Sequence, residues 1–222
     1  YECKPQKEIE KLKNKELAQL CIGNYIYRKT EGSFAMGTGF AGQTTILLDD
    51  IKNTLIMADG PAGLRLSKVY GIDYRGYHKL SPSPLLMNDY SYYEMQDKIC
   101  LKKDYSELED KFMDYRQIVH QYATAIPIAT AIAQSFNVEL AKSFGDIIGK
   151  EMEVFNIHLW LAPAMNIHRH ILCGRNFEYF SEDPLVSGKI AAGLTLGVQK
   201  HKNKGVTLKH FAGNNQEFNR LN

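Results

Sequence analysis

Short apolar runs alternate with apolar stripes through the second half of the chain. The runs at 125–129, 157–162 and 206–208 are short and continuous, which is typical of buried strands. Between them, residues 137–155 and 184–200 repeat apolar side chains every three to four positions, which predicts two helices. Strand, helix, strand, helix and strand at this spacing indicate parallel strands joined by helical crossovers.

The sequence also predicts where the second helix begins and which helix positions face a core. Asp183 stands directly before Pro184, so we expect these residues to be the N-cap and first position of the second helix. The expected inward positions are Leu140, Phe144, Ile147, Ile148 and Met152 in the first helix, and Leu185, Ile190, Leu194 and Val198 in the second.

The first half of the chain has a weaker pattern. Residues 7–21 carry apolar side chains at helical spacing, and residues 30–45 are rich in Gly, Ser and Thr, as loops are. Residues 55–58 form an apolar run that ends at Asp-Gly-Pro, which predicts a buried strand entering a turn. Residues 66–95 are expected to form a long excursion, followed by a short helix at 107–120.

Polar residues follow the predicted strands. Asp59 comes after the first, Asn166 follows another, and Lys209 and His210 end the last. In parallel α/β folds the carboxyl ends of the strands build the site, so these side chains should share one rim.

The number of strands bears on the fold class. Four candidate core strands in 222 residues fit about the first half of a closed (β/α)8 barrel better than a whole one, which needs about 250 residues. We therefore expect one partial barrel domain, with residues 1–54 as a lead-in helix and loop and residues 55–222 as the first barrel strands and helices. An open doubly wound sheet is the alternative, although no Gly-x-Gly-x-x-Gly opens a helix.

Composition excludes several classes of function. A net charge of +2 gives no reason to expect nucleic acid, and no stretch is long and apolar enough for a membrane span. The chain begins at Tyr1 with no signal-peptide pattern, which suggests a fragment of a longer protein. Four cysteines without zinc or redox spacing favour free thiols in a reducing compartment, and therefore the cytoplasm.

The predicted rim mixes cations, carboxylates and amides. Each hydroxyl of a sugar both donates and accepts hydrogen bonds, so such a mixture suits a neutral, hydroxyl-rich ligand. Phosphate is the rival, because Arg and Lys also bind it, but a glycine-rich phosphate loop is absent from the sequence. His168 and His170 have a spacing that can ligate zinc, yet no third ligand is evident, so we expect no metal site.

Four segments together carry a family resemblance. Residues 58–65 (ADGPAGLR), 162–169 (APAMNIHR), 174–184 (GRNFEYFSEDP) and 209–217 (KHFAGNNQE) occur in the order and spacing of the β-glucosidase-type enzymes of glycoside hydrolase family 3. The chain resembles that family over most of its length from about Leu55 onward. His170 and Ile171 stand where the family usually has Asn-Pro, which alters backbone stiffness at that point.

The resemblance implies a (β/α)8-type barrel, a small carbohydrate substrate and no cofactor. It also implies a set of residues that grip the terminal sugar of a β-linked substrate. These are Asp59, Arg65, Arg175, Lys209, His210 and Arg220.

The resemblance also implies that the chemical groups lie elsewhere. Family members use an aspartate nucleophile just before a Trp, whereas Trp160, the single Trp here, has Leu on both sides. We therefore expect no catalytic residue in this chain, with the nucleophile and acid/base supplied by the remainder of the barrel and a second domain of a parent glycosidase. Alternatives are an inactive sugar-binding or assembly fragment and a phosphate-binding barrel of another family.

Plainer structural roles remain open for several of these residues. Asp59 can act as a turn former, and Lys209 can extend from a strand end to solvent. Arg175 can pair with Glu178 or Glu182. The Tyr-rich region from Tyr74 to Tyr93 suits either sugar stacking or packing against a neighbouring domain.

Overall fold

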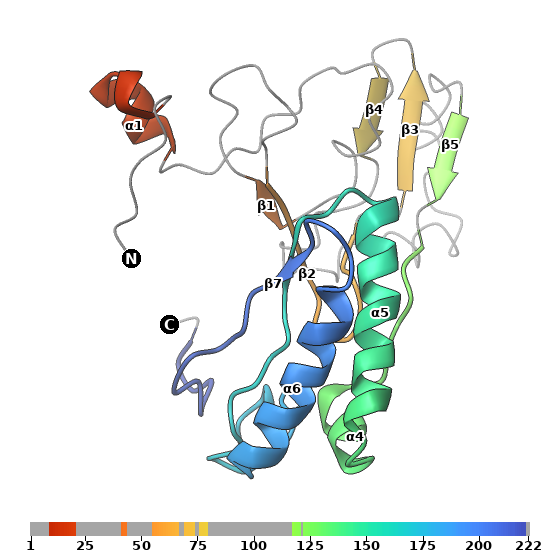
Figure 1. Ribbon diagram of the computed structural model, residues 1–222, viewed down its shortest axis with the longest axis vertical. Coiled ribbons are helices and arrows are strands. Elements are labelled where there is room, and N and C mark those ends of the chain that lie inside the picture. The colour runs from red at the N-terminus through yellow and green to blue at the C-terminus, as the bar shows by residue number, and fades with distance from the viewer. Residues whose placement is uncertain are drawn as a thin grey trace, which may run out of the picture.

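The computed structural model describes residues 9–20, 41–43, 55–66, 69–73, 76–79, 117–120 and 122–220. Figure 1 shows the arrangement of its helices and strands. In chain order these elements are η1 (Ile9–Lys11), α1 (Asn14–Leu20), β1 (Gly42–Gln43), β2 (Ile56–Asp59), β3 (Val69–Asp73), β4 (Gly76–Lys79), β5 (Gln117–His120), α4 (Ala129–Gln134), α5 (Val138–Val154), β6 (Leu159–Leu161), η4 (Asn176–Glu178), α6 (Pro184–Val198) and β7 (Gly205–Val206).

A parallel sheet lies at the centre of the fold. The strand order is β1-β2-β6-β7, in which β2, β6 and β7 run parallel and β1 joins the edge antiparallel. Ala58 pairs with Trp160, which in turn pairs with Val206. Helices connect the parallel strands, which confirms the predicted α/β class and the partial (β/α)8 architecture.

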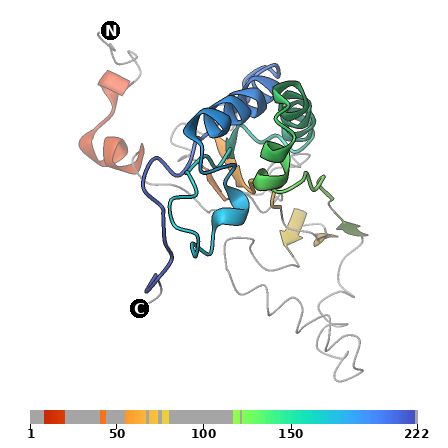
Figure 2. The ribbon, with the colours of Figure 1, turned by 90° about the horizontal axis from the view of Figure 1, so that it is seen from below.

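Helices α5 and α6 lie side by side against this sheet (Figures 1 and 2). Each begins at a capping side chain: Asn137 accepts from the amide of Leu140 at 3.0 Å, and Asp183 accepts from the amide of Leu185 at 2.6 Å. Pro184 opens α6, where its missing N–H costs no hydrogen bond. The predicted capping by Asp183 and Pro184 is therefore confirmed.

Glycines let the two helices touch backbone to backbone. A Cβ added at Gly145 of α5 would stand 2.1 Å from the carbonyl oxygen of Leu194, and one added at Gly197 of α6 would stand 2.2 Å from that of Lys142. Side chains therefore cannot replace these glycines without separating the helices.

This close packing corrects the predicted core face. Ile148, Met152, Ile190, Leu194 and Val198 are buried as expected. Leu140 and Leu185, by contrast, are 38% and 68% exposed. The contact face of α5 includes the small residues Ala141, Gly145 and Gly149. The prediction was based on the spacing of large apolar residues, and therefore did not include these positions.

The predicted strand at 125–129 is wrong. Ile126 donates its amide to the carbonyl of Ala62, but this segment joins no ladder, and α4 begins at Ala129. Pro127 has no N–H to offer a neighbouring strand, which breaks the ladder in the middle of the run. Three of the four predicted core strands are therefore observed.

The short helix predicted at 107–120 is also wrong where the structure describes it. Residues 117–120 form strand β5, which pairs antiparallel with β3 so that Val69 lies opposite His120. Strands β3 and β4 lie within the predicted excursion at 66–95, and with β5 they make a second, antiparallel sheet. The β-branched pair Ile118–Val119 favours a strand over a helix.

The remaining expectations are partly tested. The N-terminal helix is present as η1 and α1, although residues 7, 8 and 21 lie outside the described residues, as do Cys3, Cys21, Cys100 and most of the Tyr-rich region. Cys173 is a buried free thiol. In the described part of the chain, every helix is too short or too polar to cross a membrane.

Candidate functional site

Asp59 is the last residue of β2, at the carboxyl end of the parallel strands, and the loop that follows it is tightly folded. Its backbone folds back so that the amide of Arg65 donates to the carbonyl of Asp59 at 2.8 Å. The buried indole of Trp160 donates to the carbonyl of Gly60 at 2.9 Å, which fastens the loop to β6. Gly60 has φ +118°, and a Cβ there would lie 1.9 Å from the oxygen of Gly63, so the turn requires glycine.

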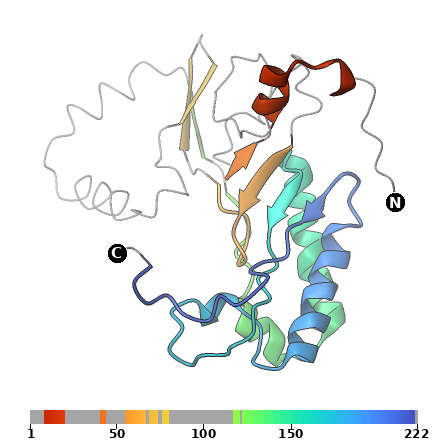
Figure 3. The ribbon, with the colours of Figure 1, turned by 90° about the vertical axis from the view of Figure 1, so that its left-hand side faces the viewer.

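Lys209 contacts Asp59 from the segment that follows β7, so that β6 lies between the two residues in the sheet. Strand pairing continues past β7 through a parallel bridge between Ala164 and Lys209, and the amide of Met165 donates to the carbonyl of Lys209 at 2.5 Å. This pairing aligns Lys209 with the carboxyl ends of β2 and β6. Figure 3 shows the segment after β7 running past these strand ends.

Asp59, Lys209 and Arg65 form the first polar group of the site. Lys209 Nζ lies 2.6 Å from Asp59 Oδ1, and Arg65 Nη1 lies 3.9 Å from Asp59 Oδ2. Burial alone raises the pKa of Asp59, but the hydrogen bond and charge of Lys209, with help from the Gly60 amide and Arg65, bring that pKa below its ordinary value. Asp59 is therefore an ionised acceptor between two cations.

Arg175 and Arg220 belong to a second polar group, held by carboxylates. Arg175 donates through Nε to Glu178, which is buried, and lies 3.9 Å from Glu217 Oε1. Arg220 Nη1 lies 2.6 Å from Glu217 Oε2. Of the two partners that the sequence offered for Arg175, Glu178 is the one in contact.

His210 lies beside this second group. Its Nδ1 is 2.8 Å from the hydroxyl oxygen of Tyr179, and the two rings meet edge to face. The side-chain amide of Asn214 also donates to that hydroxyl. Burial lowers the pKa of His210, and the charges of Arg175 and Lys209 lower it further, so the imidazole is neutral at pH 7.

Asn166 joins the loop after β6 to the loop after Lys209. Its Oδ1 accepts from the amides of Gly213 and Asn214 at 3.2 and 3.1 Å, and its Nδ2 donates to the carbonyl of Asn214 at 3.1 Å and to Asn215 Oδ1 at 3.1 Å. The side chain is buried. Asn166 therefore fixes the position of the chain that follows His210.

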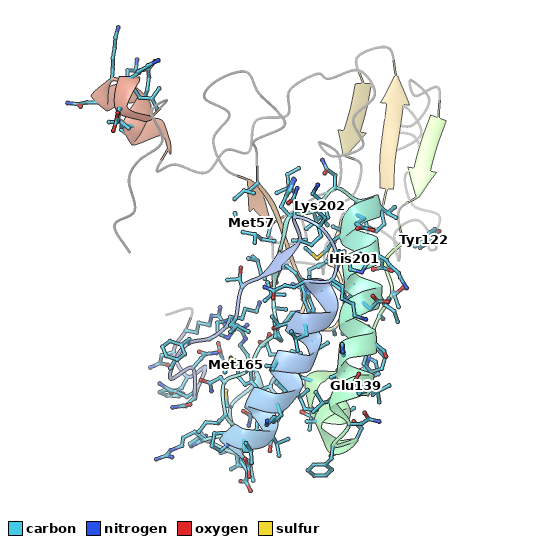
Figure 4. All side chains as sticks on the ribbon, in the orientation of Figure 1. Met57, Tyr122, Glu139, Met165, His201 and Lys202 are labelled. Atoms are coloured by element: carbon cyan, nitrogen blue, oxygen red, sulfur yellow. The ribbon has the colours of Figure 1, made fainter. Side chains whose placement is uncertain are left out.

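The six residues selected from the sequence thus occupy one region of the molecule. Lys209 and His210 are consecutive, so they join the group around Asp59 to the group around Arg175. A hollow of about 440 Å³ lies next to His210, which alone of the six lines it, together with Met165, Asn166 and Phe211 among others. Figure 4 shows Met165 below the sheet, beside the C-terminal segment.

Sequence reasoning missed the residues that position these groups. Tyr179, Asn214 and Glu217 lie within the family-like segments, yet no role was predicted for them. Their signal is their composition: an acidic and aromatic run at 174–184 and an amide-rich run at 214–219, each in the part of the chain that follows a parallel strand.

His168 and His170 are not brought together. His168 Nε2 is 3.0 Å from the carbonyl oxygen of Tyr179, whereas His170 is exposed and its Nδ1 accepts from the amide of Leu172. Among the residues that the structure describes, no cluster of three or more His, Cys, Asp or Glu side chains is arranged to hold a metal ion.

Comparison with known proteins places this arrangement in a family. Residues 109–218 match the model described as the glycosyl hydrolase family 3 N terminal domain. Beta-glucosidase A of Butyrivibrio fibrisolvens is 48% identical over 97 residues, which is 44% of this chain and 12% of that enzyme. An exo-alpha-(1->6)-L-arabinopyranosidase of Bifidobacterium longum is 44% identical over 99 residues, covering 45% of this chain and 13% of that enzyme.

The fold agrees with the sequence match. The structure of beta-glucosidase 3B from Thermotoga neapolitana in complex with glucose superimposes with a TM-score of 0.65 at 30% identity, covering 95% of this chain and 23% of that one. The chain thus spans about an eighth to a quarter of the length of these relatives. Four sequence segments, the parallel sheet, the family model and these relatives agree, and the chain belongs to glycoside hydrolase family 3.

Proposed function

We propose that this chain binds the terminal sugar of a β-linked glycoside within a retaining, exo-acting glycosidase of the β-glucosidase type. The observation that carries the proposal is the meeting of Asp59 with Lys209, next to His210, at the mouths of successive parallel strands. Arg65, Arg175 and Arg220 supply further donors at its margin.

The charges at this point favour a sugar over phosphate. The carboxylate of Asp59 lies within the cationic group, where it accepts hydrogen bonds from hydroxyls but repels a phosphate oxygen. Lys209 carries three N–H donors, and one of them is engaged with Asp59. The two others, together with the free lone pairs of Asp59, can satisfy neighbouring hydroxyls that both donate and accept.

The chain's role in catalysis is to orient the substrate. Retaining hydrolysis needs a nucleophilic and an acid/base carboxyl about 5–5.5 Å apart across the scissile bond. The sequence contains no Asp-Trp pair, and the carboxylates of Glu178 and Glu217 are engaged with arginines. We infer that both reacting carboxyls come from sequence outside these 222 residues, and that the isolated chain does not hydrolyse glycosides.

The test is hydrolysis by the whole protein in which this chain occurs. We expect release of glucose from an aryl β-glucoside, and a loss of kcat/KM of about 10- to 100-fold or more for Asp59→Asn, as for a lost hydrogen bond to a charged group. Hydrolysis of an aryl α-L-arabinopyranoside in place of the β-glucoside would instead indicate the activity for which the Bifidobacterium longum relative is named. Unchanged kinetics in Asp59→Asn, with the fold retained, would overturn the role of Asp59.

A binding module without catalysis is the second candidate, and the missing Asp-Trp pair is the observation that favours it. In that case the whole protein binds glucose without turning over any aryl glycoside. Calorimetric titration with glucose, followed by the hydrolysis assay on the same sample, separates the two candidates.

A further inference from the structure

We propose that Tyr179 is a positioning residue that holds the proton of neutral His210 on Nε2, so that the imidazole offers an N–H donor to the sugar while its Nδ1 accepts from the Tyr179 hydroxyl. The part of this inference that concerns the sugar rests on the proposed function. The part that concerns the proton position rests on the hydrogen bonds of the protein alone.

The direction of the hydrogen bonds follows from Glu217. Its ionised carboxylate can only accept, so the side-chain group of Asn214 that lies 3.2 Å from Glu217 Oε1 is the amide nitrogen. That nitrogen has two hydrogens, and it also donates to the hydroxyl oxygen of Tyr179. Tyr179 is therefore an acceptor toward Asn214 and keeps its own O–H for another partner.

His210 Nδ1 is that partner. In the part of the chain that the structure describes, the recorded partners of the Tyr179 hydroxyl are Asn214 and His210, and the tyrosine side chain is buried. If Nδ1 carried the proton, the tyrosine oxygen would accept twice and its own O–H would stay buried without an acceptor, which destabilises a folded protein. The opposite arrangement satisfies both the Tyr179 hydroxyl and Nδ1 of His210.

The surrounding charges support this pattern. Burial raises the pKa of Tyr179 and lowers that of His210, so both groups are neutral at pH 7. The charges of Arg175, Lys209 and Arg220 lower the pKa of His210 further. The charge of Glu178 raises that pKa, but by less than burial and Arg175 lower it. A neutral imidazole has a single N–H, and with Nδ1 accepting it lies on Nε2.

Tyr179 is held firmly enough to perform this role. Its backbone carbonyl accepts from the hydroxyl of Thr130 at 3.0 Å and contacts His168 Nε2 at 3.0 Å. The site thereby offers an acceptor at Asp59, which Lys209 contacts, and a donor at Nε2–H of His210, the next residue after Lys209 in the chain. One fixed acceptor and one fixed donor require one sugar hydroxyl to donate and another to accept, and so contribute to substrate specificity.

The experiment uses the whole protein with 15N in its histidines and measures side-chain ¹H–¹⁵N correlations without sugar. We expect His210 to show a proton on Nε2 and none on Nδ1. In Tyr179→Phe the His210 signals should shift toward a mixture of the two tautomers. His168, which contacts the backbone of Tyr179, is the internal control and should not change.

A second measurement compares glucose binding by His210→Gln, which keeps an amide near the Nε2 position, with His210→Asn, which keeps one near Nδ1. We expect the first to bind about tenfold more tightly than the second, as for one net hydrogen bond. A proton on Nδ1 of His210, or spectra that Tyr179→Phe leaves unchanged, would overturn the inference even if glucose binds. Failure of glucose to bind with Nε2 protonated would overturn the proposed function instead.

Discussion

The ammonium nitrogen of Lys209 lies 2.6 Å from Oδ1 of Asp59, although 150 positions separate the two residues. The contact spans the sheet from the mouth of β2 to the segment after β7, with β6 between them. It closes only when all three parallel strands are in register. This pair therefore reports both on the fold and on the site.

Replacing Asp59 with Asn should destabilise the protein by about 1–2 kcal/mol at pH 7, because a charge-assisted hydrogen bond at a partly exposed position is lost. The pKa of Asp59 is lowered on folding, so its stabilisation is present above about pH 4 and is lost as pH falls through the folded pKa. Urea unfolding of both proteins between pH 2 and 7 should show curves that converge in acid. A constant gap at every pH would contradict the ion pair.

His158 should make stability fall in mild acid. Its Nδ1 accepts from the amide of Ile56 at 3.0 Å, and burial, aided by the charge of Lys204, lowers the pKa of His158. Below about pH 6.5 His158 is protonated in the unfolded chain but stays neutral in the folded chain. The free energy of unfolding therefore drops as pH falls toward the folded pKa.

The matched variant is His158→Asn, which keeps an acceptor near Nδ1 and does not titrate. Unfolding free energies measured from pH 5 to 8 should lose part of their slope in this variant. If both proteins keep the same slope, His158 is not a source of acid sensitivity.

Gly145→Ala should destabilise by about 1–3 kcal/mol or more, because the new Cβ would stand 2.1 Å from a carbonyl of α6. Gly188→Ala is the control, since Gly188 lies within α6 and a Cβ there meets nothing within 4 Å. It should be neutral or stabilising by up to about 1 kcal/mol. Thermal melts of the two variants test this, and equal effects would argue against the close contact of α5 with α6.

Asn166→Ala should free the loop that follows His210. The amides of Gly213 and Asn214 lose their acceptor, so we expect their hydrogen exchange to quicken and stability to fall by about 1–3 kcal/mol. Asn166→Asp keeps the single oxygen that accepts from both amides and should protect them better than Asn166→Ala does. Similar exchange in Asn166→Ala and the parent protein would show that the loop is held by other contacts.

Elements were predictable from the sequence where a local pattern has one physical meaning. The parallel strands β2, β6 and β7 and the cap at Asp183 follow from apolar runs and capping chemistry. The strand expected at 125–129 failed because Pro127 lacks the N–H that a ladder needs. The face of α5 was misjudged because contact through Gly145 depends on the neighbouring helix, which periodicity does not describe.

The polar residues at the ends of the strands could be selected from the sequence, but the residues that position them could not. Asp59, Lys209 and His210 could be selected because they end strands and lie in family-like segments. The alignment of Asn214 with Tyr179, 35 positions away, depends on how two loops meet, and this is set by tertiary packing.

The central claim is that polar side chains from successive strand mouths surround a single pyranose ring. A crystal structure of the whole protein with glucose bound tests it most directly. The account predicts sugar oxygens within hydrogen-bond distance, about 2.7–3.2 Å, of Asp59, Lys209, His210 and Arg175 together. Glucose bound to the protein without touching Asp59 and Lys209 would contradict it.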